Sequence, residues 1–211
     1  MPSSRVSSPA APPAVAARKA PRSAKVIIAG GFGVGKTTLV GTLSEVPPLT
    51  TEAAMTTASV GIDDTSKVST KTTTTVAMDF GRLTINDEMI LFLFGTPGQD
   101  RFGFMWDDLV VGSLGAVVLV DLRRIDDCFP AIDFFESRNV PFIVAINRFE
   151  GAPAPVISEV REALDLNPEV PIVECDVRYK ESVKSVMLSL LELLIAQFKH
   201  KRQSKSRQSF R

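Results

Sequence analysis

The sequence has very little of the chemistry on which disulfide-rich proteins, zinc proteins and histidine-dependent enzymes rely. Its 211 residues include two cysteines, Cys128 and Cys175, and one histidine, His200. Two distant cysteines are too few for a disulfide framework and lack metal-ligand spacing, so we expect a reducing, cytoplasmic environment. A single histidine in a basic segment argues against a zinc site and against a histidine-based catalytic triad.

Long apolar runs and an excess of one charge are also missing. No apolar run approaches the roughly 18 residues of a membrane span, and 24 Lys and Arg residues balance 24 Asp and Glu residues. A balanced charge provides no general attraction to nucleic acid, so we expect no nucleic-acid partner. Pro2 and the absence of cysteine from the last four residues argue against a lipid anchor.

The composition divides the chain into three parts. Residues 1–24 are rich in Pro, Ala and Ser, which predicts a disordered arm. Residues 25–198 have the length and apolar content of one domain with a full hydrophobic core. Residues 199–211 form a basic run, for which we expect a flexible tail that associates weakly with the inner face of a membrane.

Within residues 25–198, short apolar runs alternate with longer helical patterns, which is typical of an α/β domain with a mainly parallel sheet. The predicted strands are 25–30, 75–85, 88–94, 115–122, 140–147 and 171–175, and the predicted helices are 35–45, 126–138, 155–166 and a last one from Lys180. Turn residues at 86–88 predict a hairpin. We therefore expect one antiparallel edge strand in a central sheet with helices on both faces.

Two further segments carry specific expectations. Residues 47–74 are polar and threonine-rich, and we predict a long functional loop with a helical turn near 51–58. In the last helix, apolar residues at helical spacing predict one face packed on the sheet. These residues are Val183, Val186, Met187, Leu190, Leu194 and Phe198.

The strongest chemical motif is "GGFGVGKTT", residues 30–38. Gly30, four further residues and then Gly35-Lys36-Thr37 fit the phosphate-binding loop, between a strand and a helix start as the mechanism needs. Lys36 is expected to contact the β- and γ-phosphates and to assist catalysis, and the Thr37 hydroxyl to bind Mg²⁺. The residues predicted to line the phosphates are Gly31, Gly33, Val34, Gly35, Lys36, Thr37 and Thr38.

A second motif, "NRFE", follows a buried strand at residues 147–150. Asn147 lies at the carboxyl end of that strand, where open α/β sheets bind ligands. A carboxylate at Glu150 can accept hydrogen bonds from the N1–H and the 2-amino group of guanine, which adenine does not offer in that arrangement. The alternative is that Glu150 is a solvated loop acid. GTP or GDP is the predicted ligand.

With "GTPGQDRF" at 95–102 and "ECDVR" at 174–178, these motifs occur in an order that resembles small Ras-like GTPases. Within them, the chain resembles the bacterial branch that includes MglA and the conservon-encoded (CvnD-type) GTPases of actinobacteria. The resemblance covers about residues 25–198 and implies a Ras-like P-loop NTPase fold. It implies a GTP-dependent molecular switch with slow hydrolysis, and it places the stem of Arg148 along the base and the amides of Asp176 and Val177 near the guanine oxygen.

The resemblance also identifies departures from the family pattern. Most of the family carries Asp where this chain has Glu150, and most carries a Mg²⁺-associated Asp where this chain has Gly95, an absence that the MglA-like branch commonly shares. We therefore expect weaker Mg²⁺ binding and a mobile second switch. In that switch, Gly98 is expected to donate its N–H to the γ-phosphate and Gln99 to orient the attacking water as a catalytic residue.

The threonine of the first switch is less well defined. The spacing from Thr75 to Asp79 matches the threonine of Rab-like relatives, so Thr75 is our choice as the second Mg²⁺ ligand. Thr72 and Thr70 are the alternatives if the loop is arranged as in MglA. The remaining threonines fit a polar strand edge.

Residues after the second switch suggest partner contacts. Arg101 is a candidate for neutralising charge during hydrolysis, with a surface role as the alternative. The cluster Phe102, Phe104, Met105 and Trp106 fits either an exposed contact surface or core packing. By resemblance, the partners are a roadblock-type regulator and a sensor-kinase-like conservon protein.

Two other functions remain compatible with the sequence. One is a guanine-nucleotide-dependent binding scaffold with negligible hydrolysis, which the missing acid at Gly95 favours. The other is an ATP-dependent P-loop kinase, for which the "NRFE" and "TPGQ" motifs would have no use.

Overall fold

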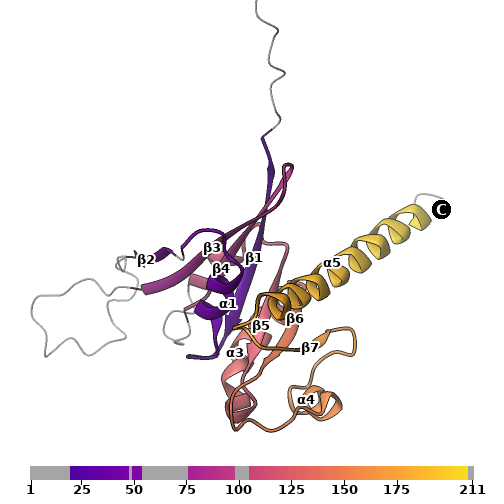
Figure 1. The fold of residues 1–211 in the computed structure, drawn as a ribbon. Helices are drawn as coiled ribbons and strands as arrows, with labels where there is room; N and C mark the ends of the chain where they lie inside the picture. Colours follow the sequence, from indigo (N-terminus) through magenta and orange to yellow (C-terminus); the bar gives the residue numbers. More distant parts are fainter. Residues whose placement is uncertain (1–19, 48, 54–75, 98–104, 209–211) are drawn as a thin grey trace, which may run out of the picture.

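A computed structural model describes residues 20–47, 49–53, 76–97 and 105–208 (Figure 1). The strands among them form one sheet in the order β2-β3-β4-β1-β5-β6-β7. Their bounds are β1 (Arg22–Gly30), β2 (Leu49–Ala53), β3 (Val76–Asn86), β4 (Met89–Gly95), β5 (Gly115–Val120), β6 (Phe142–Asn147) and β7 (Ile172–Cys175).

The sheet is mainly parallel, as predicted from the alternating pattern. Neighbouring strands from β4 through β1, β5 and β6 to β7 pair in parallel. β3 is antiparallel to β4, to which the predicted hairpin joins it, and also to β2. β2 therefore forms the edge, and the antiparallel strand lies one position further in than we expected.

β2 also corrects the helical turn predicted near residues 51–58. Thr51 pairs with Met78 and Ala53 with Val76, so residues 51–53 are strand. Threonine favours extended backbone, and a neighbouring strand is available to pair with it. Residues 54–75 lie outside the described part of the chain.

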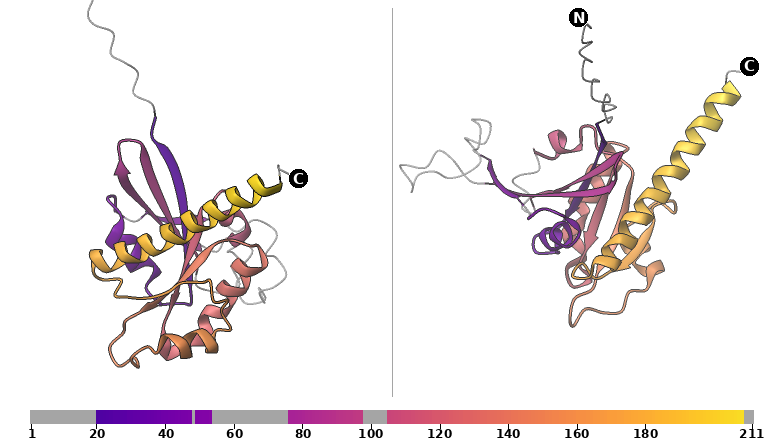
Figure 2. Two further views of the ribbon diagram at one scale, coloured as in Figure 1. Left: turned by 90° about the vertical axis from the view of Figure 1, so that its right-hand side faces the viewer. Right: turned by 45° about the horizontal axis from the view of Figure 1, so that its top comes forward.

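Helices cover both faces of the sheet (Figure 2). They are α1 (Lys36–Leu43), α2 (Trp106–Val110), the 3₁₀ helix η4 (Leu122–Cys128), α3 (Phe129–Ser137), α4 (Ile157–Ala163) and α5 (Lys180–Gln208). Successive side chains of a strand point to opposite faces. In β1, Val26 and Ile28 pack with α1 and α5, while Ile27 and Ala29 pack with α2, α3 and α4.

The helix predicted at 126–138 is divided in the structure: its first residues belong to the 3₁₀ helix η4, and α3 begins at Phe129. Asp121 caps the start of η4 by accepting a hydrogen bond from the Arg123 N–H at 3.0 Å. The backbone then departs from helical geometry at Arg124, where φ is −148° and ψ is 59°. α3 follows this kink, with Pro130 in its first turn, where a missing N–H costs nothing.

The last helix is 29 residues long and extends beyond the sheet (Figure 1). Val183, Val186, Met187 and Leu190 are buried as predicted, but Phe198 is 63 % exposed because the helix has left the domain surface at that point. Residues 199–208, for which we expected a flexible tail, continue α5 as helix. Across the ranges described above, no helix is both long enough and apolar enough to cross a membrane.

The topology brings the ends of several strands to one edge of the sheet. Parallel strands end on the same side, so Gly30 of β1, Gly95 of β4, Asn147 of β6 and Cys175 of β7 lie along that edge. Open α/β sheets bind ligands there. Cys175 and Cys128 are both free and buried.

Candidate nucleotide-binding site

The loop predicted to bind phosphate joins β1 to α1. Gly30, Gly33 and Gly35 have φ values of +133°, +73° and +106°, a region in which L side chains are strained. At Gly35 an added Cβ would also lie 2.8 Å from Asn147 Nδ2. These glycines let the backbone curl tightly between the strand and the helix, which is the shape that a phosphate-binding loop needs.

Lys36 is buried inside this loop, with 7 % of its surface exposed. Its ammonium group donates hydrogen bonds to the carbonyl oxygens of Gly30 at 2.8 Å and Gly31 at 2.7 Å. Burial lowers the pKa of Lys36 to about 8, and the charge of Asp79 acts in the opposite direction. Within the described residues, the hydrogen-bond acceptors of this buried cation are neutral loop oxygens, which favours the approach of an anion.

Thr37 begins the exposed side of α1, next to Thr38. Its hydroxyl donates a hydrogen bond of 2.7 Å to Oδ2 of Asp79, which lies on β3. Sequence reasoning used Asp79 only as a spacing marker and missed this contact. An acid inside an otherwise uncharged strand segment, "TVAMDF", was the available signal.

Asp79 gives a physical reason for the unusual glycine at the end of β4. The register of β3 on β4 pairs Asp79 with Gly95. A Cβ added at Gly95 would lie 2.9 Å from both Cβ and Oδ2 of Asp79, which is closer than such atoms approach in proteins. Gly95 thus leaves the space that the Asp79 side chain occupies.

The oxygens at this end of the site fit a magnesium ion. Mg²⁺ prefers carboxylate and hydroxyl oxygens and keeps several of its waters. The Thr37 hydroxyl and the Asp79 carboxylate already lie together, and the buried Thr96 hydroxyl has no hydrogen-bond partner in the described residues. The acid absent from Gly95 is therefore matched by an acid on the adjacent strand.

At the end of β6, the Asn147 side chain forms hydrogen bonds to two loops, the phosphate loop and the loop that follows β7. It is 3 % exposed, its Nδ2 donates to the Val34 carbonyl at 2.9 Å, and its Oδ1 accepts from the Val177 N–H at 3.2 Å. The Asp176 N–H donates to Ser182 Oγ at 2.9 Å. The two amides expected to meet a base oxygen thus have acceptors within the protein, while Asn147 keeps one donor and one acceptor in reserve.

The other predicted base-binding residues carry charge: Arg148 and Glu150 are exposed, and the Asp176 side chain is partly buried. Arg148 is paired with Glu174 at 2.6 Å, and Asp176 with Arg178 at 2.6 Å. The hydrogen bond from Arg178 holds the pKa of Asp176 below its ordinary value. Glu150 is exposed on the same loop as Arg148.

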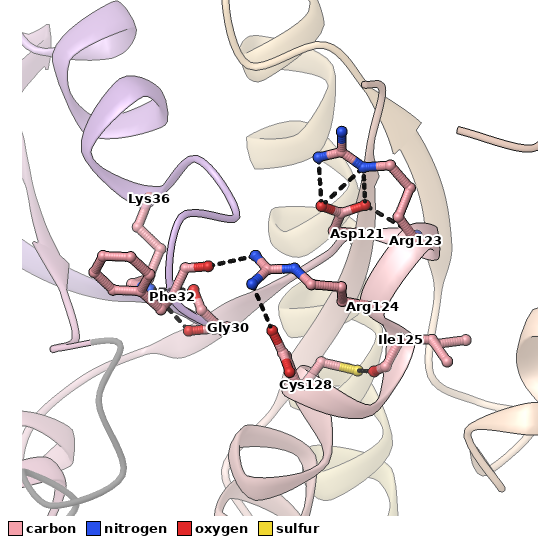
Figure 3. A network of polar contacts seen from close by, with 10 residues as sticks. Gly30, Phe32, Lys36, Asp121, Arg123, Arg124, Ile125 and Cys128 are labelled. Atoms are coloured by element: carbon pink, nitrogen blue, oxygen red, sulfur yellow. Dashed lines mark hydrogen bonds and ion pairs between the residues drawn. The ribbon is translucent and has the colours of Figure 1, made fainter. Parts of the chain in front are cut away.

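Sequence reasoning missed the contribution of η4, which lies beside the phosphate loop (Figure 3) and also contacts the "NRFE" loop. Arg123 pairs with Asp121 at 2.7 Å, and its guanidinium lies 4.1 Å from the ring centre of Phe149 in the "NRFE" loop. Arg124 donates to the Phe32 carbonyl at 2.6 Å in the phosphate loop. The sequence "DLRRIDD" carries no motif that marks these contacts.

Several predicted residues lie outside the described part of the chain: Thr75, Gly98, Gln99, Arg101, Phe102 and Phe104. Of their neighbours, Trp106 is buried, and its ring lies 5.2 Å from that of Phe134 and 6.4 Å from that of Phe135. For Trp106 the core-packing alternative is therefore the one observed.

A glycine-rich loop around a buried lysine, between the first parallel strand and the helix that follows it, defines a P-loop NTPase domain. Solved structures share this fold. The G domain of the FeoB iron transporter of T. maritima is similar with a TM-score of 0.57 and 17% identity, over 82% of this chain and 99% of that one. The FeoB G domain of Methanococcus jannaschii has a TM-score of 0.53 and 12% identity, over 82% and 98%.

The chain belongs to the family described as "conserved hypothetical ATP binding protein", whose model matches residues 28–198. A curated relative, the uncharacterized protein MJ1339 of Methanocaldococcus jannaschii, is 36% identical over 126 residues. That alignment covers 59% of this chain and 69% of the relative. Fold and family together indicate nucleotide binding through the loop after β1.

Proposed function

We propose that the protein binds GTP and GDP with Mg²⁺ and hydrolyses GTP slowly as a molecular switch. The observation that carries this proposal is the position of Asn147. Its side chain joins the end of β6 to the phosphate loop through the Val34 carbonyl, at 2.9 Å. A nucleotide whose phosphates lie in the loop therefore has its base near the residues that follow Asn147.

The choice of guanine depends on Glu150. The family description names ATP, and the phosphate loop itself does not distinguish the two purines. Glu150 lies three residues after Asn147 with its carboxylate exposed. Guanine presents two adjacent donors to such a carboxylate and adenine does not, so the carboxylate favours guanine.

Magnesium would be held by Thr37 and Asp79, with Thr75 as a further candidate. When bound, it would supply charge neutralisation at the phosphates. Lys36 adds positive charge inside the loop, and Gln99 and Gly98 are proposed to orient water and to hold the γ-phosphate. Hydrolysis also needs charge neutralisation that a partner can supply, which is why slow turnover of the isolated protein is proposed.

We further propose that the protein belongs to the Ras-like branch that includes MglA and the conservon GTPases. Its proposed partners are a roadblock-type regulator and a sensor-kinase-like protein. The exposed face of α5 supports contact with other surfaces. Leu188, Leu191, Ile195 and Phe198 are exposed at spacings of three and four residues, and the basic segment follows directly. Such a face also fits weak attachment to an anionic membrane.

Single-turnover phosphate release tests this proposal. GTP and ATP are each mixed with excess protein and Mg²⁺, with Lys36→Ala as the inactive control. We expect slow release from GTP, faster with a roadblock partner, and little from ATP. Tight GTP binding without release would support the scaffold alternative, and release or transfer from ATP alone would support the kinase alternative.

A further inference from the structure

η4 approaches the phosphate loop so closely that the loop has no room for a side chain at Gly31. A Cβ added there would lie 2.5 Å from Cβ of Asp127. The sequence analysis assigned Gly31 to phosphate contact, but its lack of a side chain is also what admits η4. The two segments are 92 residues apart in the sequence where Arg124 meets Phe32.

The contact at the tip of the loop is made by Arg124. Its Nη2 donates to the Phe32 carbonyl at 2.6 Å, and its Nη1 lies 3.4 Å from Oδ2 of Asp127 (Figure 3). The guanidinium therefore lies between a backbone carbonyl and a carboxylate. The neighbouring Arg123 takes a different partner, Asp121, so the two arginines are not interchangeable.

The orientation of the Phe32 carbonyl has a consequence for the next amide. A peptide unit is planar and trans, so the carbonyl of Phe32 and the N–H of Gly33 point in opposite directions. Because the carbonyl points to Arg124 outside the loop, the Gly33 N–H points away from Arg124. In a phosphate-binding loop the inward-pointing N–H groups are the ones that contact phosphate.

We propose that Arg124 is a positioning residue of the phosphate site: it holds the Phe32–Gly33 peptide so that the Gly33 N–H faces the nucleotide phosphates. The proposal rests on the proposed nucleotide binding of this loop. Gly33 has φ of +73° and no side chain to hinder rotation of this peptide. Without Arg124, the Phe32 carbonyl has no charged donor among the described residues and can turn toward the phosphates, where it would repel them.

If Arg124 only stabilised the fold, its loss would lower the melting temperature, whereas the positioning role predicts weaker phosphate binding with little change in stability. Exposed ion pairs contribute little to stability, and the side chains of Arg124 and Asp127 are 49 % and 43 % exposed. Loss of Arg124 should therefore leave the melting temperature almost unchanged. Its effect should appear in phosphate binding.

The test measures GDP and ADP binding to the full-length protein with Mg²⁺, for wild type, Arg124→Ala and Arg124→Lys. The matched control is Arg138→Ala, because Arg138 pairs with Asp107 at 2.6 Å and is comparably exposed, but contacts α2 and α3. We expect about 10-fold to 100-fold weaker binding in Arg124→Ala, the range for a charged hydrogen bond. Arg124→Lys should recover most of the loss, and the control should match wild type.

The second readout is the amide resonance of Gly33 by NMR, which should shift on nucleotide binding in wild type and much less in Arg124→Ala. Unchanged affinity in Arg124→Ala, or weaker binding with the full Gly33 shift, would overturn the proposal alone. If the wild type binds ADP in preference to GDP, the guanine assignment is refuted, and the role of Arg124 is then judged by the same two readouts with ADP. A wild type that binds neither nucleotide would overturn both. If Arg124→Ala does not fold, Arg124→Gln is judged by the same two readouts.

Discussion

The phosphate end and the base end of the site are held by different kinds of contact. At the phosphate end, Lys36 is buried and bonded to loop carbonyls, and Thr37 is bonded to Asp79 on the adjacent strand. At the base end, Arg148 pairs with Glu174 and Arg178 with Asp176, and both arginines are about two-thirds exposed. The phosphate end is therefore formed before any ligand arrives, whereas the base end combines the buried Asn147 with ion pairs of exposed arginines.

This difference indicates how the site divides its tasks. Preformed buried contacts cost little further ordering when a ligand binds, so they supply affinity for any nucleoside diphosphate. Exposed ion pairs contribute little stability and exchange partners easily. Under the proposed function, selection of the base therefore depends mainly on exposed groups, and we expect substitutions there to alter it without loss of the fold.

The largest expected effect follows removal of the buried cation. Lys36→Ala should weaken GDP and GTP binding by about 1000-fold, within the range for truncating one partner of a buried charged contact. Calorimetric titration measures this, with Lys184→Ala on the exposed face of α5 as the control. A loss of less than about 10-fold would mean that the phosphate end does not supply the affinity.

The same residue should make a contribution to the stability of the nucleotide-free protein that grows with pH. The pKa of Lys36 is lowered from 10.5 to about 8 by burial. Between these values the unfolded chain holds a proton on Lys36 that the folded protein has released, so the contribution of Lys36 to the free energy of unfolding increases with pH. The increase is at most about 3 kcal/mol. Urea denaturation of wild type and Lys36→Met at pH 7.5, 9 and 10.5 measures it as the difference between the two proteins. The difference is needed because burial raises the pKa of the Cys128 and Cys175 thiols to about 12, which lowers the stability of both proteins above about pH 9.

Asp79 tests whether the phosphate end includes a magnesium site. Asp79→Asn keeps the shape but removes the charge, and we expect about 10-fold to 30-fold weaker Mg²⁺ binding to the GDP complex, as for loss of a charged contact. Mg²⁺ titration followed by a fluorescent nucleotide provides the measurement. Asp87→Asn, in the turn at the other end of the same hairpin, is the control. Equal Mg²⁺ affinity in both variants would assign Asp79 a structural role only.

The smallest effect is expected at the base end. Glu150→Gln should reduce the preference for GDP over ADP by about 10-fold, since an exposed carboxylate contributes less than a buried one. Competition binding measures the ratio, with Glu136→Gln on α3 as the matched exposed control. An unchanged ratio would identify Glu150 as a solvated loop acid.

The phosphate loop and most strands could be predicted because their patterns are local. The phosphate loop is recognised from the spacing of glycine, lysine and threonine within residues 30–37, and the buried strands appear as apolar runs. The contacts that complete the phosphate end could not be predicted, because they depend on register and on packing between distant segments. Thr37 meets Asp79 only because β3 pairs with β4 so that Asp79 lies opposite Gly95.

Dependence on packing between distant segments also explains the other differences between the sequence predictions and the structure. Residues 51–53 form a strand because β3 is there to pair with them, which local composition does not reveal. Phe198 continues the apolar spacing of α5 but lies beyond the sheet that would cover it. Arg124 reaches the phosphate loop because Gly31 leaves space for η4.

The central claim is that one nucleotide lies with its phosphates in the loop at Lys36 and its guanine at Asn147 and Glu150. Its most direct test is displacement of a labelled guanine nucleotide from the wild-type protein by unlabelled GDP and ADP. The account predicts half-displacement by GDP at a concentration about 100-fold lower than by ADP, a difference of about 3 kcal/mol in binding free energy. Displacement by ADP at the same concentration as GDP, or at a lower one, would contradict it.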